Sequence, residues 1–169
     1  LTKPTEPTLF VSHHGYGSAF DLNVYAALAT FDEIGLSEPV TLLAHELAWK
    51  IGVGRLVEPF GARPAGHESA RESFAQGKHA FVIPGGDVDG FKPHRDRNHI
   101  VFDHRTGFAQ LAIDTGVPII PIVTSGAGNT LFAVSDGRKL ARLLQIDRLF
   151  RLKAIPTTIS IPWGFNFGL

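Results

Sequence analysis

Two adjacent histidines and a nearby aspartate are the residues of this chain best suited to proton transfer. The apolar run Leu9–Ser12 predicts a buried strand, and it is followed by His13, His14, two glycines and Asp21. A neutral imidazole can take a proton from an alcohol, and a carboxylate can fix its tautomer and stabilise the imidazolium that forms. The glycines let the loop fold back so that His14 and Asp21 meet. These residues alone leave two interpretations open: His14 is a general base oriented by Asp21, or Asp21 only caps the following helix while His14 packs in a loop, which is the more common case.

The acidic pair Asp87 and Asp89 is a second candidate for chemistry, because it follows a Pro-Gly-Gly turn. Such a pair could hold a metal ion and a sugar nucleotide in a metal-dependent glycosyltransferase or hydrolase, or it could form a turn with a helix N-cap. His94, His99 and His104 recur every five residues, a spacing that suits neither one helix face nor one strand face. We expect a solvated basic loop there and no metal site.

Several familiar motifs are missing from the sequence. The glycine pairs at 52 and 54 and at 126 and 128 lack the third glycine of a dinucleotide fingerprint, and no Gly-Lys-Ser/Thr phosphate loop occurs. A Gly-x-Ser-x-Gly elbow is also missing, which disfavours a serine hydrolase, and the lack of Cys excludes thiol chemistry. Sixteen basic and 16 acidic residues give zero net charge, which argues against a nucleic-acid-binding domain.

Strands and helices are expected to alternate along the chain and to position these residues. Apolar runs predict strands at Leu9–Ser12, Val40–Leu43, Ala80–Ile83 and, as the last, Thr157–Ile161. Helical spacing and end signals predict helices at Asp21–Ala29, Ser69–Gln76, Thr106–Thr115 with Gly116 as its C-cap, and Asp136–Gln145. Prolines confine Val117–Val123 to an irregular or terminal strand. This order predicts an α/β fold with a mixed, mostly parallel sheet flanked by helices.

The length of 169 residues fits a single domain over 1–169, and 44% apolar with 19% charged residues excludes a disordered or fibrous chain. The sequence contains no methionine and ends in a mostly apolar stretch, Ile161 to Phe167. We therefore expect a fragment or the ordered part of a longer protein. No apolar run reaches the roughly 18 residues that would span a membrane.

Four motifs occur in order between residues 10 and 123. The first is the strand with His14 and Asp21, and the second is the Gly-to-Arg stretch from Phe60 through Arg63 to His67. The third is the Pro-Gly-Gly of residues 84–86, and the fourth is the Arg-x-Gly-Phe that opens at Arg105 and leads into Val-Pro-Ile-Ile-Pro. Together they resemble the glycerolipid acyltransferase superfamily, most closely its branch of diacylglycerol acyltransferases and related bacterial proteins.

The resemblance implies an O-acyltransferase that moves a fatty acyl group from acyl-CoA or acyl carrier protein to a hydroxyl of a glycerolipid or other lipid alcohol. His14 would be the general base that deprotonates the alcohol, with Asp21 orienting it. The alkoxide of the acceptor would attack the thioester carbonyl directly, so no covalent acyl-enzyme is needed. The resemblance implies no cofactor and no metal. The N–H groups of Gly85 and Gly86 are candidate oxyanion donors; a plain strand-to-helix turn is the alternative.

Three cationic side chains are further candidates for binding substrate. Arg63 and Arg105 could bind the phosphate of CoA or of an acceptor, because a guanidinium binds phosphate bidentately. His67 stands where the family often has Arg, and Gly85 stands where related enzymes have Glu. These two departures keep open a catalytically inactive acyl- or lipid-binding module on the same fold.

Membrane contact is expected from lipid substrates. The segment Leu140–Leu152 mixes bulky apolar residues with arginines, which suits an interfacial helix on anionic lipid, although packing on the core explains the same pattern. The resemblance implies a protein peripheral to the cytoplasmic side of a membrane, with acyl-CoA and a lipid alcohol as partners and no nucleic acid.

Overall fold

The chain divides into two compact units that alternate along the sequence. A computed structural model describes residues 3–15, 21–36, 38–50, 52, 54–126, 129, 131–135, 137, 139, 143, 157–160 and 164–167. The first unit comprises Leu1–Ser12, Ala27–Pro84 and Arg105–Ile122, and the second comprises His13–Ala26, Gly85–His104 and Val123–Leu169. The single domain expected over 1–169 stays a prediction.

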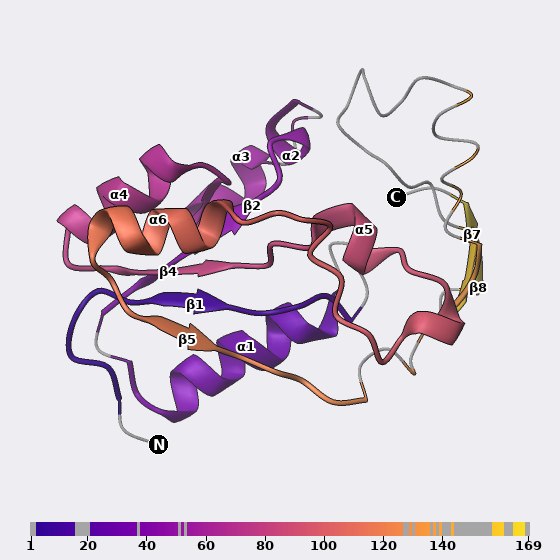
Figure 1. Ribbon diagram of the computed structural model, residues 1–169, viewed down its shortest axis with the longest axis horizontal. Helices are drawn as coiled ribbons and strands as arrows, with labels where there is room; N and C mark the ends of the chain where they lie inside the picture. The colour runs from indigo at the N-terminus through magenta and orange to yellow at the C-terminus, as the bar shows by residue number, and fades with distance from the viewer. Residues whose placement is uncertain are drawn as a thin grey trace. The chain divides into compact units, whose positions relative to one another are not determined.

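A five-stranded parallel sheet forms the core of the first unit, with the strand order β3-β2-β4-β1-β5 (Figure 1). Its strands are β1 Leu9–Val11, β2 Val40–Ala44, β3 Ala62–Pro64, β4 His79–Val82 and β5 Ile119–Pro121. In the central pairings Phe10 lies opposite both Phe81 and Ile120. Because parallel strands are covered on both faces, such strands are apolar along most of their length. The predicted α/β class, a mostly parallel sheet flanked by helices, is confirmed.

The strand β5 lies at the edge of this sheet, where its prolines are tolerated. Pro118 and Pro121 have no N–H group to donate, which an edge strand tolerates, and among the described strands β5 pairs with β1 alone. The N–H of Leu9 donates to the Pro118 carbonyl at 2.9 Å, and the N–H of Ile122 donates to the Val11 carbonyl at 2.8 Å. The predicted terminal position of this apolar run is confirmed.

Helices cover both faces of the sheet in the first unit. Helices α4 (His67–Ala75) and α6 (Gly107–Thr115) lie on one face, and the second half of α1 (Leu22–Glu33) lies on the other (Figure 1). Phe31 of α1 packs against Phe10 and Phe81, with ring centroids 4.7 and 5.8 Å apart. Between β2 and β3 the chain forms the short helices α2 Leu47–Lys50 and α3 Gly54–Val57 and the 3₁₀ helix Glu58–Phe60.

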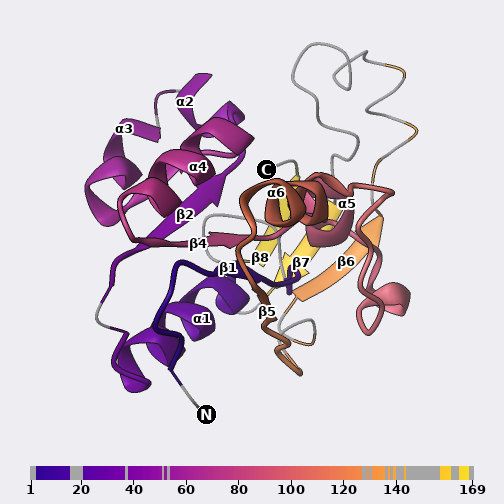
Figure 2. The ribbon, with the colours of Figure 1, turned by 60° about the vertical axis from the view of Figure 1, so that its left-hand side comes forward.

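The second unit contains an antiparallel sheet with the order β6-β7-β8 (Figure 2). Its strands are β6 Leu131–Ser135, β7 Thr157–Ser160 and β8 Gly164–Phe167, and its other elements are α5 Gly86–Gly90 and the 3₁₀ helix His94–Asp96. A strand forms at β7 as expected, but the expectation that Thr157–Ile161 is the last strand was wrong. The strand β8 follows it in the sequence and pairs with β7 in antiparallel orientation.

The remaining predicted helices differ in how far the structure tests them. The helix expected at Ser69 begins at His67, two residues earlier, with Gly66 in an extended conformation before it. Gly116 takes a φ of 70° after α6, which confirms it as the C-cap. The helices expected at Asp136–Gln145 and Leu140–Leu152 lie largely outside the described residues. Of the helices that the structure describes, none has the length and hydropathy to cross a bilayer.

Candidate functional site

The two predicted catalytic side chains contact each other in the second unit. Oδ2 of Asp21 accepts a hydrogen bond from Nδ1 of His14. The Asp21 side chain is 1% exposed, whereas that of His14 is 16% exposed and reaches solvent. Because Nδ1 faces the carboxylate, the neutral ring carries its proton there and leaves a lone pair on Nε2. Nε2 of His14 has no hydrogen-bond partner among the residues that the structure describes.

The second oxygen of Asp21 explains its place at a helix start. Oδ1 accepts the N–H of Asn23 at 2.9 Å, and α1 begins at Leu22. A side-chain oxygen at this position satisfies one of the N–H groups that lack a partner in the first helical turn. The carboxylate therefore caps the helix and holds His14 at the same time, so the two interpretations of Asp21 are compatible.

The neighbouring His13 is engaged in main-chain contacts. Its Nε2 accepts the N–H of Thr124 at 3.1 Å, and its carbonyl accepts a hydrogen bond from the buried Asn23 side chain at 2.7 Å. A lone pair that already accepts a hydrogen bond is not open to a substrate proton. Of the two adjacent histidines, His14 therefore has the geometry of a general base.

Two side chains that the sequence interpretation did not connect with His14 hold its main chain. Oδ2 of Asp89 accepts the N–H of His14 at 2.6 Å. Lys92 donates from Nζ to the His14 carbonyl at 3.2 Å and to Oδ1 of Asp89 at 2.6 Å. His14 and Asp89 lie 75 positions apart in the sequence and meet within the second unit. The sequence suggests a metal site or a turn with a helix N-cap for Asp89, and it predicts no role for Lys92.

Asp89 is fully engaged by donors of this chain. In addition to the two contacts above, Oδ1 accepts the N–H of Val101 at 2.9 Å. Within the described part of the chain, no group of three or more His, Asp or Glu side chains is arranged to hold a metal ion. The alternative of a metal-dependent enzyme built on Asp87 and Asp89 gains no support from this geometry.

Gly85 makes room for the Asp89 side chain. A Cβ atom on Gly85 would collide with Asp89 and would lie 2.6 Å from the Val101 carbonyl oxygen. Gly86 has a φ of 50°, in the left-handed region that favours glycine. Gly85 precedes α5 as its N-cap residue and Gly86 is the first residue of this helix, which agrees with a strand-to-helix turn. Their role as oxyanion donors stays a prediction.

The predicted phosphate-binding side chains lie in the first unit and each contacts a main-chain carbonyl. The exposed Arg63 bonds to the carbonyl of the residue before it at 2.8 Å. Nε2 of the exposed His67 lies 3.0 Å from the Gly107 carbonyl, and Arg105 donates to the Pro84 carbonyl at 3.3 Å. Substrate binding by these three side chains stays a prediction.

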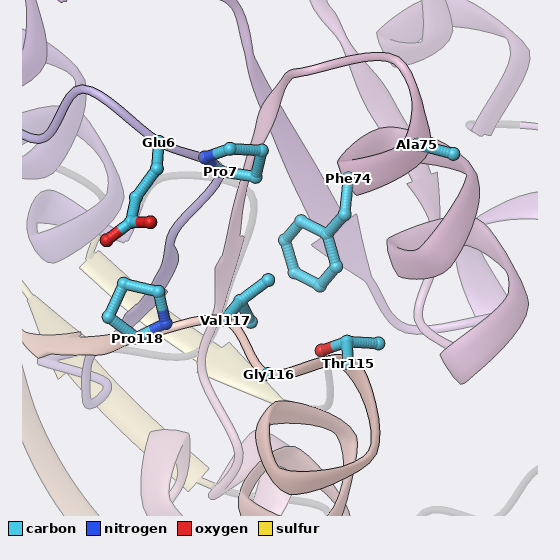
Figure 3. A pocket seen from close by; sticks show the side chains of 8 residues that line it. All are labelled: Glu6, Pro7, Phe74, Ala75, Thr115, Gly116, Val117 and Pro118. Atoms are coloured by element: carbon cyan, nitrogen blue, oxygen red, sulfur yellow. The ribbon is translucent and has the colours of Figure 1, made fainter.

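Two of the pockets in the described part of the chain open on the surface of the first unit. The larger holds about 390 Å³ and lies at the amino ends of β1 and β5, where Figure 3 shows the Phe74 ring and Val117 pointing toward each other. The smaller holds about 230 Å³ and includes Arg63, Glu72 and Lys78 in its lining. The lining of neither pocket includes the predicted catalytic pair.

Comparison with known proteins identifies the family. A family model described as "Diacylglycerol acyltransferase" matches residues 61–168, which is more than half of the chain. The chain belongs to the diacylglycerol acyltransferase family. The matched range contains the Pro-Gly-Gly motif and the motif that opens at Arg105, whereas His14 and Asp21 lie before it.

Relatives of this family member are found in mammals. The chain is 33% identical over 119 residues to a human protein named "DGAT1/2-independent enzyme synthesizing storage lipids", covering 70% of this chain and 35% of that protein. The mouse protein of the same name is 30% identical over 122 residues, with 72% of this chain and 36% of that protein covered.

The chain thus spans about a third of the length of the curated relatives that it matches. No solved structure matches it. The expected bacterial branch finds no support in these relatives, and placement in the wider glycerolipid acyltransferase superfamily still rests on the motifs alone.

Proposed function

We propose that this member of the diacylglycerol acyltransferase family transfers a fatty acyl group from the thioester of acyl-CoA or acyl carrier protein to the hydroxyl of a lipid alcohol. The observation that supports this reaction most directly is the contact between His14 and Asp21. It presents an imidazole Nε2 lone pair beside solvent and buries the carboxylate that orients the ring.

The proposed reaction needs one base and no covalent intermediate. Nε2 of His14 takes the hydroxyl proton while the alcohol oxygen bonds to the thioester carbonyl carbon. Asp21 stabilises the imidazolium that results. When the carbon–sulfur bond breaks, the imidazolium returns the proton to the departing thiolate, so the products are an ester and a free thiol and the base is regenerated.

The other predicted residues supply binding and charge stabilisation in this proposal. Main-chain N–H groups of Gly85 and Gly86 stabilise the oxyanion, which requires donors about 3 Å from it. Arg63, His67 and Arg105 bind the phosphate groups of CoA or of a lipid acceptor. The name of the mammalian relatives, which describes an enzyme synthesizing storage lipids, supports a glycerolipid acceptor.

The proposal includes a peripheral contact with the cytoplasmic side of a membrane, where lipid alcohols reside. In the first unit Leu56 and Phe60 are 71% and 79% exposed, and the cationic Lys50, Arg55 and Arg63 near them in sequence are exposed too. Exposed apolar tips with cationic neighbours suit insertion into an anionic lipid surface.

The test compares the protein in its full natural length with its His14→Ala and His13→Ala variants. Each receives long-chain acyl-CoA and a panel of lysophospholipid, mono- and diacylglycerol acceptors, with and without EDTA, and both free CoA and ester are measured. We expect His14→Ala to lose roughly 10²–10⁴-fold in kcat, the usual contribution of a general base. His13→Ala should keep most of the activity, because that ring has no open lone pair.

Three results would count against the proposal. Activity that survives in His14→Ala would remove the assigned base, and activity abolished by EDTA would favour the metal-dependent alternative. Binding of acyl-CoA by folded protein without turnover on any acceptor would favour the inactive binding module.

A further inference from the structure

We propose that the buried ion pair of Asp89 and Lys92 positions His14 through its main chain for acyl transfer. This inference rests on the proposed function, since it concerns the same base. It assigns a role to two side chains that touch neither the imidazole ring nor, in the proposed reaction, the substrate.

The two side chains engage both peptide groups that flank the Cα atom of His14. The N–H on one side donates to Asp89 at 2.6 Å, and the carbonyl on the other side accepts from Lys92 at 3.2 Å. Fixing both peptide groups fixes the φ and ψ angles of His14 and thereby the direction of its Cα–Cβ bond. Asp21 then fixes the rotation of the ring. Together these contacts define where Nε2 points.

The pair is itself held in place within the second unit. Asp89 and Lys92 are 0% and 5% exposed and lie 2.6 Å apart, and the N–H of Val101 gives Asp89 its third donor. The absence of a side chain on Gly85 lets Asp89 approach that part of the chain. Hydrogen bonds to ionised groups are stronger and more directional than those between neutral groups, which suits them to hold a loop.

Stability alone is a weak explanation for a buried ion pair. Removing two charges from water is costly, and apolar side chains of similar volume often give equal or higher stability. A general base, in contrast, gains from being held accurately, because a displacement of about 1 Å can cost roughly 10²-fold in rate. Apolar side chains in place of Asp89 and Lys92 could not form the hydrogen bonds to the main chain of His14.

The decisive variant is the charge-neutral double substitution Asp89→Asn with Lys92→Met in the full-length protein. Each single substitution leaves one buried charge unpaired and is expected to lower the Tm, whereas the double variant restores the charge balance. We expect its Tm to return close to that of the wild type. The exposed pair Arg71 and Asp114, 3.0 Å apart, provides the matched control as Arg71→Met with Asp114→Asn.

Two readouts separate positioning from a merely structural role. Amide hydrogen exchange should become faster in the peptide that contains His14, and kcat should fall by about 10²-fold while KM for acyl-CoA changes little. Added to His14→Ala, the double substitution should cause no further loss, because the residue it positions is gone. The control pair should change neither the exchange nor kcat.

Each outcome decides a separate part of the inference. A double variant with wild-type kcat overturns positioning, and so does unchanged exchange at His14 or a further loss in the His14→Ala background. If the wild type transfers no acyl group to any acceptor, the proposed function fails. The exchange measurement alone then decides whether the pair holds His14.

Discussion

The carboxylate of Asp21 serves a helix and a histidine through its two different oxygens. Oδ1 receives the N–H of Asn23 at the start of α1, and Oδ2 receives Nδ1 of His14. The stability of the helix start and the orientation of the proposed base therefore depend on the same side chain. Substitutions at this position can separate the two roles, because asparagine caps a helix about as well as aspartate does.

Asp21→Asn is expected to lower kcat strongly with little effect on folding. The amide keeps an oxygen for the helix cap, but it cannot stabilise the imidazolium, and its NH₂ group favours the wrong tautomer of His14. The same Asp-to-Asn change in the Ser-His-Asp triad of a serine protease lowers kcat by about 10⁴-fold. Activity and thermal unfolding of Asp21→Asn measured side by side test this expectation.

The matched control is Asp21→Ala, which removes both roles. It should lose activity and also destabilise the protein by about 0.5–2 kcal/mol through the lost cap. An active Asp21→Asn variant would show that the carboxylate acts only as a helix cap.

The pairing of His14 with Asp21 could be predicted because a short glycine-containing loop separates the two residues and because this segment resembles the first acyltransferase motif; the loop alone was equally compatible with a helix cap. The hydrogen bonds of Asp89 and Lys92 to the main chain of His14 could not be predicted in the same way. Asp89 lies 75 positions away from His14, so no local sequence pattern connects the two residues. Asp89 and Lys92 also carry no signal that distinguishes a buried pair from a solvated one.

The segment formed by α3 and the following 3₁₀ helix presents two apolar side chains to solvent. Leu56 and Phe60 are four positions apart and mostly exposed. Helix α2 supports this segment, because the indole N–H of Trp49 donates to the Glu58 carboxylate at 2.5 Å. A supported element with exposed apolar tips fits the proposed membrane contact.

Combined Leu56→Ser and Phe60→Ser substitutions are expected to weaken binding to phosphatidylserine-containing vesicles by about tenfold or more. Burying one Leu or Phe side chain contributes about 1.5–3 kcal/mol, of which partial insertion keeps a share. Vesicle co-sedimentation provides the measurement. Ile113→Ser is the control, since Ile113 is 76% exposed on α6. Equal binding by both variants would exclude α3 and the 3₁₀ helix as the contact.

Element lengths explain which parts of the fold could be predicted. The apolar runs of β1, β2 and β4 and the caps of α6 are strong local signals, and these elements form where expected. The strand Ala62–Pro64 and the helix Gly86–Gly90 are too short and too rich in Gly or Pro for a periodic pattern. Local propensity does not account for these two elements. The strand Ala62–Pro64 is stabilised by its pairing with β2, and the helix Gly86–Gly90 by the packing around the buried Asp89.

For the molecule as a whole, one buried histidine links folding stability to pH. His79 in β4 is 1% exposed and meets the Phe10 ring edge-on at 5.5 Å. Burial lowers the pKa of His79 below its usual value of 6.5, although the Glu38 carboxylate partly opposes this shift. Its Nδ1 has no hydrogen-bond partner within the described ranges, which agrees with a neutral ring.

The free energy of unfolding should therefore decrease as the pH falls below about 6.5. The unfolded chain binds a proton at His79 there while the folded chain does not, so stability is fully present above that pH and is lost below it, with a slope of up to about 1.4 kcal/mol per pH unit. Urea unfolding of the wild type and of His79→Phe between pH 5 and 8 measures the difference. Equal slopes in the two proteins would contradict this assignment.

The position of β1 in the sheet has a consequence for synthesis of the protein. The two neighbours of β1 in the sheet are β4 and β5, and β5 ends only at Pro121, far along the chain from Leu9. At about 5–20 residues per second, the apolar β1 segment waits on the order of ten seconds during synthesis for its last partner. Nascent chains of this protein are therefore expected to need chaperone protection during that interval, and any truncation between β1 and β5 leaves β1 open on one side to intermolecular pairing.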